Sequence, residues 1–226
     1  MHYTLDMDAS LEPLPLIAGL IWAAGIERPS RTEKAPLFLS QALMEARKVG
    51  QEYVSSSIRS SVRGMLRHGK YKPSGRGKPA SEFLLQAALR GQFPLVNAPV
   101  DVNNFISLAS GLPGSIFDAD LLGSNLLIRR GKPGEAYVFN SSGQLIDLQD
   151  LIVVCHNSND EQQPCGNPVK DSMETKTNMK TRNVVAVLYA PVDYPKDVLT
   201  HWTDRYADLL SSHCAAEIAS YRIIGA

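Results

Sequence analysis

A change of periodicity at Gly123 constrains the fold of this chain more than any other feature of the sequence. Before this glycine, apolar residues recur at the spacing of amphipathic helices, whereas after it they form short runs that predict strands. Turn segments such as Gly131–Gly134 and Ser141–Gly143 separate these runs. The predicted strands in this part are Asn125–Arg130, Ala136–Asn140, Leu145–Leu148 and Leu151–His156.

The clearest helix signals lie between Pro79 and Gly91. Pro79 suits the first turn, and Gly91 can adopt the left-handed conformation that ends a helix. A shorter helix is predicted to begin with Asp101 as its cap and to end at Gly111 and Pro113. Further helices are predicted over Pro36–Val49, Val54–Leu66 and Pro195–Ser212.

Three further apolar segments and one polar segment complete the prediction. Leu14–Ile26, Asn183–Tyr189 and Ile218–Ile224 are expected to be strands, the first of them bent. Asn157–Val169 is polar and contains two prolines, so a loop is expected there. Helices on both sides of hairpin-like strands indicate an α+β fold built from layers, rather than a doubly wound parallel sheet.

The length and composition are those of a globular chain that needs neither metals nor disulfides to stabilise its core. It has 226 residues, of which 44% are hydrophobic and 20% are charged, and its formal net charge is zero. We expect a single domain over residues 1–226. The three cysteines include no CxxC pair, so no metal site is expected.

No cofactor is expected, because two near-matches to nucleotide-binding motifs fail. Gly64–Lys70 has the spacing of a P-loop, but Tyr71 follows where a serine or threonine would bind Mg²⁺. Gly75–Ala80 opens a helix as a dinucleotide fingerprint does, yet no apolar strand precedes it. The apolar run Leu14–Ile26 is too short to span a bilayer and follows acidic residues. We therefore expect no membrane segment and no signal peptide, and a cytoplasmic location.

A basic segment between Tyr53 and Ser81 contains no carboxylate. Its arginines recur every four residues along a predicted helix and lead into a basic loop that contains glycines. Clusters of this kind bind phosphates, although a solvated helix face is the alternative. The candidate RNA-binding residues are Arg59, Arg63, Arg67, Lys72, Arg76 and Lys78.

A polar segment from Gly166 to Thr177 alternates ammonium, carboxylate and hydroxyl groups after a Gly/Pro loop. Such a set can orient a small zwitterion, because carboxylates bind an amine while lysines and hydroxyls bind a carboxylate, an ester or a ribose hydroxyl. An exposed polar hairpin is the alternative.

Several of these segments occur in an order known from one protein family. After the helix Pro79–Arg90, residues Asn97–Asn104 read NAPVDVNN and residues Gly111–Asp118 read GLPGSIFD. They are similar to the segments N-x-V-V-D-x-x-N and G-Q-P-x-H-A-F-D of the B3/B4 editing module of the bacterial phenylalanyl-tRNA synthetase β chain. The resemblance covers residues 71–191, which leaves a strand and helices in residues 1–70 and a helix and a strand in residues 192–226.

The resemblance implies a three-layer arrangement of mixed or antiparallel sheets with helices, and a free-standing B3/B4 domain. The family module hydrolyses tyrosine wrongly attached to phenylalanine tRNA, so the implied partner is a tRNA or the 3′ end of an aminoacyl-tRNA, with its amino acid. Ser115 stands where the family has a histidine, and Ala186 lies near the position of its pocket glutamate. Neither residue can act as an acid, a base or an amine anchor.

The function expected first is deacylation of mischarged tRNA in trans. Asp171 is the candidate amine anchor, and Lys170 and Lys176 are the candidate groups that stabilise an anion or oxyanion. Two alternatives stay open: a non-catalytic module that binds tRNA or an amino acid, and a hydrolase of small amino-acid esters or amides. The candidate substrate-binding residues are Asn104, Ser115, Asp118, Thr175 and Thr177.

Overall fold

Two four-stranded sheets form the centre of the protein in a computed structural model that describes residues 3–13, 15–27, 31–158 and 161–225. The first sheet contains, in spatial order, β10 (Ile218–Ile224), β2 (Leu16–Ala24), β9 (Val184–Pro191) and β3 (Gly114–Asp118). The second contains β1 (Thr4–Met7), β4 (Asn125–Arg130), β7 (Ile152–Ser158) and β8 (Glu161–Gly166). A separate hairpin pairs β5 (Ala136–Val138) with β6 (Leu145–Asp147).

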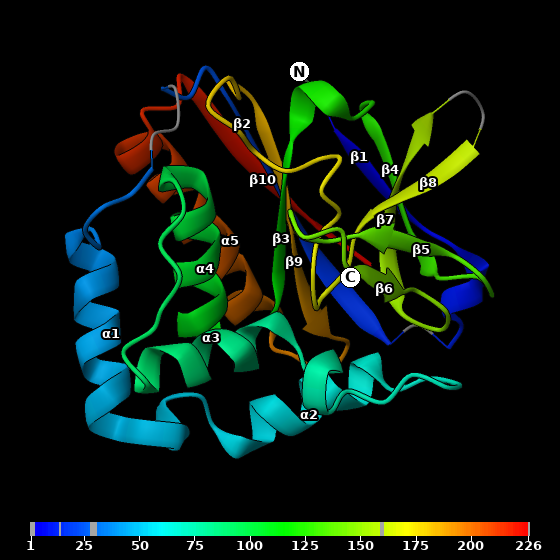
Figure 1. The fold of residues 1–226 in the computed structure, drawn as a ribbon, viewed down its shortest axis with the longest axis horizontal. Helices are drawn as coiled ribbons and strands as arrows, with labels where there is room; N and C mark the ends of the chain where they lie inside the picture. The colour runs from blue at the N-terminus through cyan, green and yellow to red at the C-terminus, as the bar shows by residue number, and fades with distance from the viewer. Residues whose placement is uncertain (1–2, 14, 28–30, 159–160, 226) are drawn as a thin grey trace.

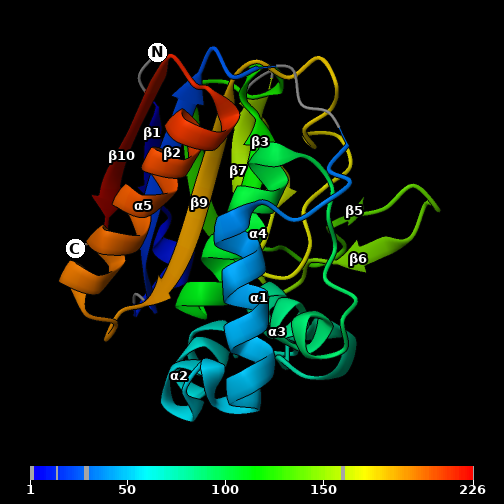
Figure 2. The ribbon, with the colours of Figure 1, turned by 90° about the vertical axis from the view of Figure 1, so that its left-hand side faces the viewer.

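Helices form the third layer. They are α1 (Leu37–Val49), α2 (Ser56–Leu66), α3 (Ala80–Leu89), α4 (Ala98–Ser110) and α5 (Lys196–Cys214). Figures 1 and 2 show α4 and α5 on one face of the first sheet, with α1 on the outer side of α4, and the second sheet on its other face. The predicted α+β class with layers of sheets and helices is therefore confirmed. No helix within the described ranges is long and apolar enough to cross a membrane.

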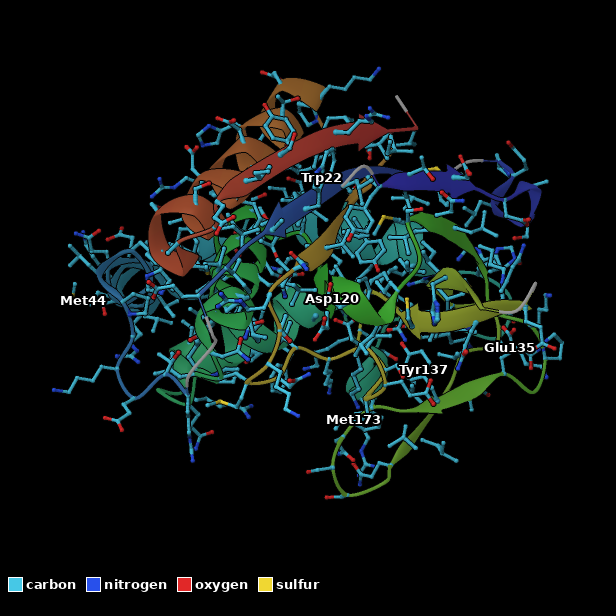
Figure 3. The ribbon with its side chains drawn as sticks, turned by 90° about the horizontal axis from the view of Figure 1, so that it is seen from above. Trp22, Met44, Asp120, Glu135, Tyr137 and Met173 are labelled. Carbon is cyan, nitrogen blue, oxygen red and sulfur yellow. The ribbon has the colours of Figure 1, made fainter. Side chains whose placement is uncertain are left out.

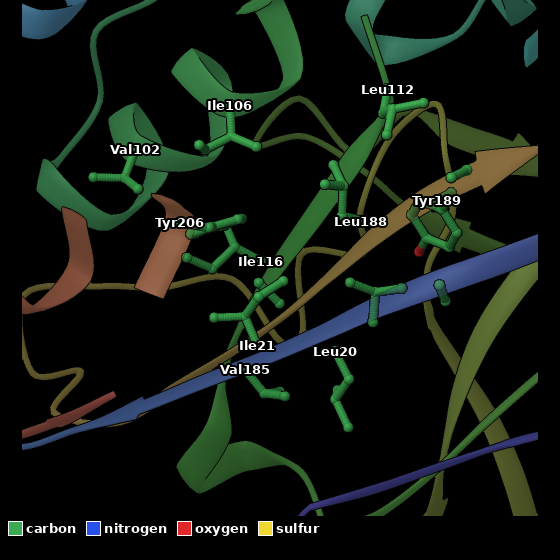
Figure 4. Close-up of a cluster of buried hydrophobic side chains, with 14 of the residues drawn as sticks. Leu20, Ile21, Val102, Ile106, Leu112, Ile116, Val185, Leu188, Tyr189 and Tyr206 are labelled. Atoms are coloured by element: carbon green, nitrogen blue, oxygen red, sulfur yellow. The ribbon is translucent and has the colours of Figure 1, made fainter. Parts of the chain in front are cut away.

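The buried core lies on both faces of the first sheet. Figure 4 shows part of it, where Val102 and Ile106 of α4 and Tyr206 of α5 gather with Ile116 of β3 in one cluster. Every residue of β9 is buried, as expected for a strand that is covered on both faces.

Two local predictions were wrong. The segment Asn157–Val169 is not a loop throughout, because β7 runs to Ser158 and Glu161–Gly166 forms β8. This strand lies at the edge of its sheet, where polar side chains face solvent and a proline is tolerated. The cap of α4 is Asn97, whose side chain accepts a hydrogen bond from the Val100 amide at 3.1 Å.

Asp101 is instead buried in the first turn of α4. Its carboxylate accepts a hydrogen bond from the Val96 amide at 2.9 Å, so it fixes the chain before the helix rather than capping it. Leu14, the first residue of the predicted strand Leu14–Ile26, lies outside the described residues, and the rest of that segment contains β2.

Close packing of α5 against β2 depends on Gly19. A Cβ atom at this position would lie 2.1 Å from the Thr203 Cγ2 methyl of α5. We expect Gly19→Ala to lower the free energy of unfolding by about 1–2 kcal/mol, because the helix or the methyl must move. Thr203→Ser removes that methyl and keeps the hydroxyl that donates to the Leu199 carbonyl at 3.0 Å. In urea titrations, the double variant should therefore lose less than the sum of the two single losses. Additive losses would contradict this packing argument.

Candidate functional site

A cavity of about 260 Å³ lies beside the edge of β3 that faces away from β9. Helix α4 forms one wall, β3 and the start of α3 form a second, and the segment after β8 forms the third. Its described lining residues are Ala80, Val96, Val100, Asn103, Asn104, Gly114, Ile116, Asn167, Val169, Lys170, Asp171, Lys176 and Thr177.

The Gly166–Thr177 segment reaches this place because it satisfies the edge of β3. Strand β3 pairs only with β9 among the described strands, so its outward amides need partners from elsewhere. The Ile116 amide donates to Asp171 Oδ2 at 3.3 Å, and the Asp118 amide donates to the Thr175 carbonyl at 2.8 Å. The segment thus stands where a further strand would pair, and it carries its charged side chains to the cavity.

Asp171 is the carboxylate of the cavity. Ser115 Oγ donates to its Oδ1 at 2.6 Å, and the Ser115 hydroxyl lies 2.9 Å from the Tyr189 hydroxyl. Burial raises the pKa of Asp171 to about 7, although the hydrogen bonds from Ser115 and Ile116 and the charge of Lys176 act in the opposite direction. Near neutral pH, this group can therefore either accept or release a proton.

Phe139, which follows β5, holds both lysines of the site. Lys176 Nζ donates to the Phe139 carbonyl, and Lys170 Nζ lies 3.9 Å from the centre of the Phe139 ring. Burial lowers the pKa of both lysines. For the pKa of Lys176 the charge of Asp171 opposes this effect, whereas for the pKa of Lys170 the charge of Arg76 adds to it.

Asn167 links the hairpin to the cavity. Its Oδ1 accepts from the amides of Val169 and Lys170 at 2.8 and 2.9 Å, and its Nδ2 donates to the Tyr137 hydroxyl at 2.5 Å. The Tyr137 hydroxyl in turn donates to the Lys170 carbonyl at 2.6 Å. Figure 3 shows Tyr137 of the hairpin and Met173 of the Gly166–Thr177 segment. The Met173 amide donates to the Val138 carbonyl, so the hairpin and the segment meet there.

Two asparagines connect α4 to the other walls. Asn97 Nδ2 donates to Thr177 Oγ1 at 3.2 Å. Asn103 Nδ2 donates to the Gly114 carbonyl at 3.3 Å, and its Oδ1 accepts from the Tyr206 hydroxyl at 3.0 Å. These contacts fix a wall whose apolar part is formed by Val96 and Val100.

The structure brings most of the sequence-predicted site residues to one cavity. Those that line it are Asn104, Lys170, Asp171, Lys176 and Thr177. Ser115 is fully buried behind Asp171 and contacts its carboxylate.

The remaining two lie elsewhere. Thr175 is buried, and its hydroxyl donates to the Cys165 carbonyl at 3.3 Å. Asp118 accepts hydrogen bonds from Thr181 Oγ1 at 2.5 Å and Asn178 Nδ2 at 3.3 Å. Neither is among the described residues that line the cavity.

The six basic candidates divide into paired and open residues. Arg59 contacts Glu52 at 3.1 Å, and Arg63 contacts Glu82 at 2.5 Å. Arg59, Arg63 and Arg67 line one groove along α2. Arg67, Lys72 and Arg76 are exposed, and Lys78 is partly buried.

Several residues of the site were missed from the sequence. They are Asn103, Tyr137, Phe139, Tyr189 and the apolar residues Val96, Val100 and Ile116, while Asn167 was included only as a member of the polar segment Gly166–Thr177. Asn167 had a usable signal, because an asparagine before a proline favours a turn closed by its own side chain. The others depend on long-range packing. In the part of the chain that the structure describes, no three His, Cys, Asp or Glu residues are arranged to hold a metal ion.

Comparisons with known proteins give related sequences and folds. The chain is 30% identical over 126 residues to the phenylalanine–tRNA ligase beta subunit of Synechococcus sp. strain CC9605, which covers 50% of this chain and 15% of that protein. The corresponding subunit of Cutibacterium acnes is 28% identical over 78 residues, covering 34% and 9%. This chain therefore spans only a small part of the length of these relatives.

An N-terminal fragment of the phenylalanyl-tRNA synthetase β-subunit from Pyrococcus horikoshii has a similar fold. Its TM-score is 0.52 at 10% identity, and the match covers 99% of this chain and 50% of that one. At this identity the match concerns the fold alone. The B3/4 domain family matches residues 74–193, which is more than half of the chain. The order of the sequence segments and the layered fold agree with this match. The chain therefore belongs to the B3/4 domain family.

Proposed function

We propose that this protein binds the 3′ end of an aminoacyl-tRNA and hydrolyses its ester bond in trans. The observation that carries the proposal is that Asp171, Lys176 and Asn104 line one small cavity together with apolar residues. An aminoacyl ester has the matching groups, namely an ammonium, a polar ester and a side chain. The kinship to the named ligase subunits supports the nucleic-acid part of the ligand. We assign the cavity and the basic segment to one domain over residues 1–226.

In this proposal, Asp171 binds the ammonium group of the substrate. Lys176 and Lys170 then face the ester, where a cation or its N–H groups stabilise the negative charge that develops when water attacks the carbonyl. Asn104 and Thr177 position the ester and the ribose. Hydrolysis of an activated ester requires little more than positioning of water and stabilisation of the oxyanion, so no side-chain nucleophile is invoked.

A second candidate function is binding without catalysis. It is favoured by Ser115 and Ala186, which stand where the resemblance places a histidine and a glutamate. Ala186 is fully buried in β9. The Ser115 hydroxyl is engaged by Asp171 and Tyr189, so it is not free to activate water.

The deciding experiment is incubation of the full chain with a panel of mischarged tRNAs. We expect release of the amino acid from at least one tRNA, and loss of this activity in Lys176→Met by about a hundredfold, the usual effect of removing one group that stabilises an oxyanion. Deacylation of none of them refutes hydrolysis. Retained tRNA binding in that case supports the binding module instead.

Salt dependence separates RNA ligands from small amino-acid esters. If Arg67, Lys72 and Arg76 contact phosphates, the affinity for tRNA should fall steeply with ionic strength, and Arg67→Glu should reduce that slope. Arg205→Glu is the matched control, because Arg205 is an exposed arginine on α5. A small ester that is hydrolysed at a rate insensitive to salt would favour the third candidate function, a small-molecule hydrolase.

A further inference from the structure

A second groove adjoins the cavity. It has a volume of about 830 Å³ and lies between the loop from Tyr71 to Gly77 and the β5–β6 hairpin. Lys170 lines both the groove and the cavity, so the two spaces meet at this side chain. The cavity accommodates a unit of about the size of an amino acid, whereas the groove has the volume of a site for a larger ligand.

The positive charge of the groove lies at its junction with the cavity. Arg76 is close enough to Lys170 for its charge to lower the pKa of that lysine. Across the described residues, no hydrogen bond or ion pair engages the Arg76 guanidinium. Two like charges held near one another without a paired carboxylate attract an anion, and a guanidinium suits the oxygens of a phosphate.

The walls of the groove are aromatic and aliphatic. The Tyr71 ring is fixed, because its hydroxyl donates to the Gly77 carbonyl and a Cβ at Gly77 would lie 3.3 Å from the ring. The rest of the apolar lining comes from Phe139, Leu145, Ile146 and Leu151, and Leu145 is 67% exposed. Flat apolar walls beside cations are the arrangement that binds the face of a nucleobase together with its phosphate.

Asp147 adds an acceptor at the hairpin end of the groove. Its Oδ1 already accepts from the Gln149 amide at 3.0 Å, and the second carboxylate oxygen remains for a hydroxyl or an amino group of a ligand. A ribose or a base presents such donors.

We propose that this groove binds a nucleoside 5′-phosphate unit, with the base against Tyr71, Phe139 and Leu145 and the phosphate at Arg76. The proposal rests on the proposed function for its continuation into the cavity, where the amino acid attached to that nucleotide would lie. The complete site therefore has two compartments that meet at Lys170, and its ligand class is an aminoacyl nucleotide.

The test is isothermal titration of the full chain with AMP, ribose 5-phosphate and adenosine as probes. We expect AMP to bind at millimolar concentrations and ribose 5-phosphate to bind about tenfold more weakly, because it lacks the stacking base. Arg76→Ala should weaken AMP binding by about tenfold through loss of a charged contact, and Leu145→Asp should weaken it to a similar degree. Arg205→Ala and Leu121→Asp are the matched controls, an exposed arginine on α5 and a 50% exposed leucine far from the groove in sequence.

The outcomes separate this proposal from the proposed function. Equal binding of AMP and ribose 5-phosphate, no binding of AMP, or AMP binding unchanged in both groove variants overturns the nucleoside site. AMP binding that is weakened in both variants supports the nucleoside site in the groove. This holds even where no mischarged tRNA is deacylated, and in that case only the proposed hydrolysis fails. Conversely, if mischarged tRNA is deacylated but neither groove variant changes AMP binding, the proposed hydrolysis stands and the proposed nucleoside site is refuted.

Discussion

Replacing Asp171 by asparagine is expected to weaken the binding of amine-bearing ligands by about a hundredfold, because a charged partner of the ammonium is lost. The same substitution should stabilise the folded protein above neutral pH. Asparagine preserves the shape of the side chain and can still accept from the Ile116 amide or the Ser115 hydroxyl. It removes, however, the cost of ionising a buried carboxyl group.

The direction of the pH effect follows from the pKa of Asp171. Its value is raised from 3.8 to about 7 by burial, so the folded protein keeps a proton that the unfolded chain releases between these values. The contribution of Asp171 to the free energy of unfolding therefore falls as pH rises from about 4 to about 7 and stays low above that range. A side-chain amide does not titrate, so this loss is absent once the carboxyl group is replaced. The Asp171→Asn variant should therefore exceed the wild type in stability at pH 8 by on the order of 2–4 kcal/mol.

Chemical denaturation at pH 5 and pH 8 measures the stability effect, and titration with amino-acid esters measures binding. Binding to the wild type should improve as pH rises through about 7, where Asp171 ionises, and decline as the ligand amine loses its proton near about 7.7–8.0. Asp208→Asn, on the exposed face of α5, is the control for removal of one carboxylate. Equal ester affinity in Asp171→Asn and the wild type would contradict its role as the amine anchor.

Elements with strong local signals were predicted from the sequence almost to their limits. Strands β4 and β10 have the predicted bounds, and α3 lies between Pro79 and Gly91 as its proline and glycine indicate. In these segments the turn residues and the apolar period act together, so neighbouring residues contain enough information.

Elements that depend on a distant partner were missed. Strand β1 is four residues long and is held by parallel pairing with β4. Strand β3 follows the end of α4 directly and is defined by pairing with β9, whereas β8 is a polar edge strand. Nothing in their own sequences marks them strongly as strands, because tertiary pairing decides their conformation.

The residues of the candidate site likewise divide into those that the sequence indicated and those that depend on distant parts of the chain. The composition of the Gly166–Thr177 segment pointed to its polar groups, and the structure places three of its charged residues at the cavity. The counterpart surfaces could not be predicted, because Phe139 and Tyr189 reach the site only through the hairpin and the buried strand β9. Their sequences indicate apolar or turn structure rather than chemistry.

Gly166→Ala is expected to damage stability and the site together. A Cβ atom at this position would lie 2.5 Å from the Phe117 ring and 2.7 Å from Asp171 Oδ1. The Phe117 ring is fully buried, so the carboxylate or the strand end must move. We expect a loss of about 2–3 kcal/mol in the free energy of unfolding, as for other overpacked cores, and weaker binding of amine-bearing ligands.

Gly64→Ala provides the matched control for this change. Gly64 lies within α2. Apart from its chain neighbours and the backbone of its own helix, no heavy atom would lie within 4 Å of an added Cβ. This variant should gain about 0.5–1 kcal/mol from helix propensity and bind ligands as the wild type does. Phe117→Leu in the Gly166→Ala background removes part of the ring that opposes the new methyl, so it should restore some ligand affinity. If Gly166→Ala has the same free energy of unfolding and the same ligand affinity as the wild type, the tight approach of β8 to Asp171 does not shape the site.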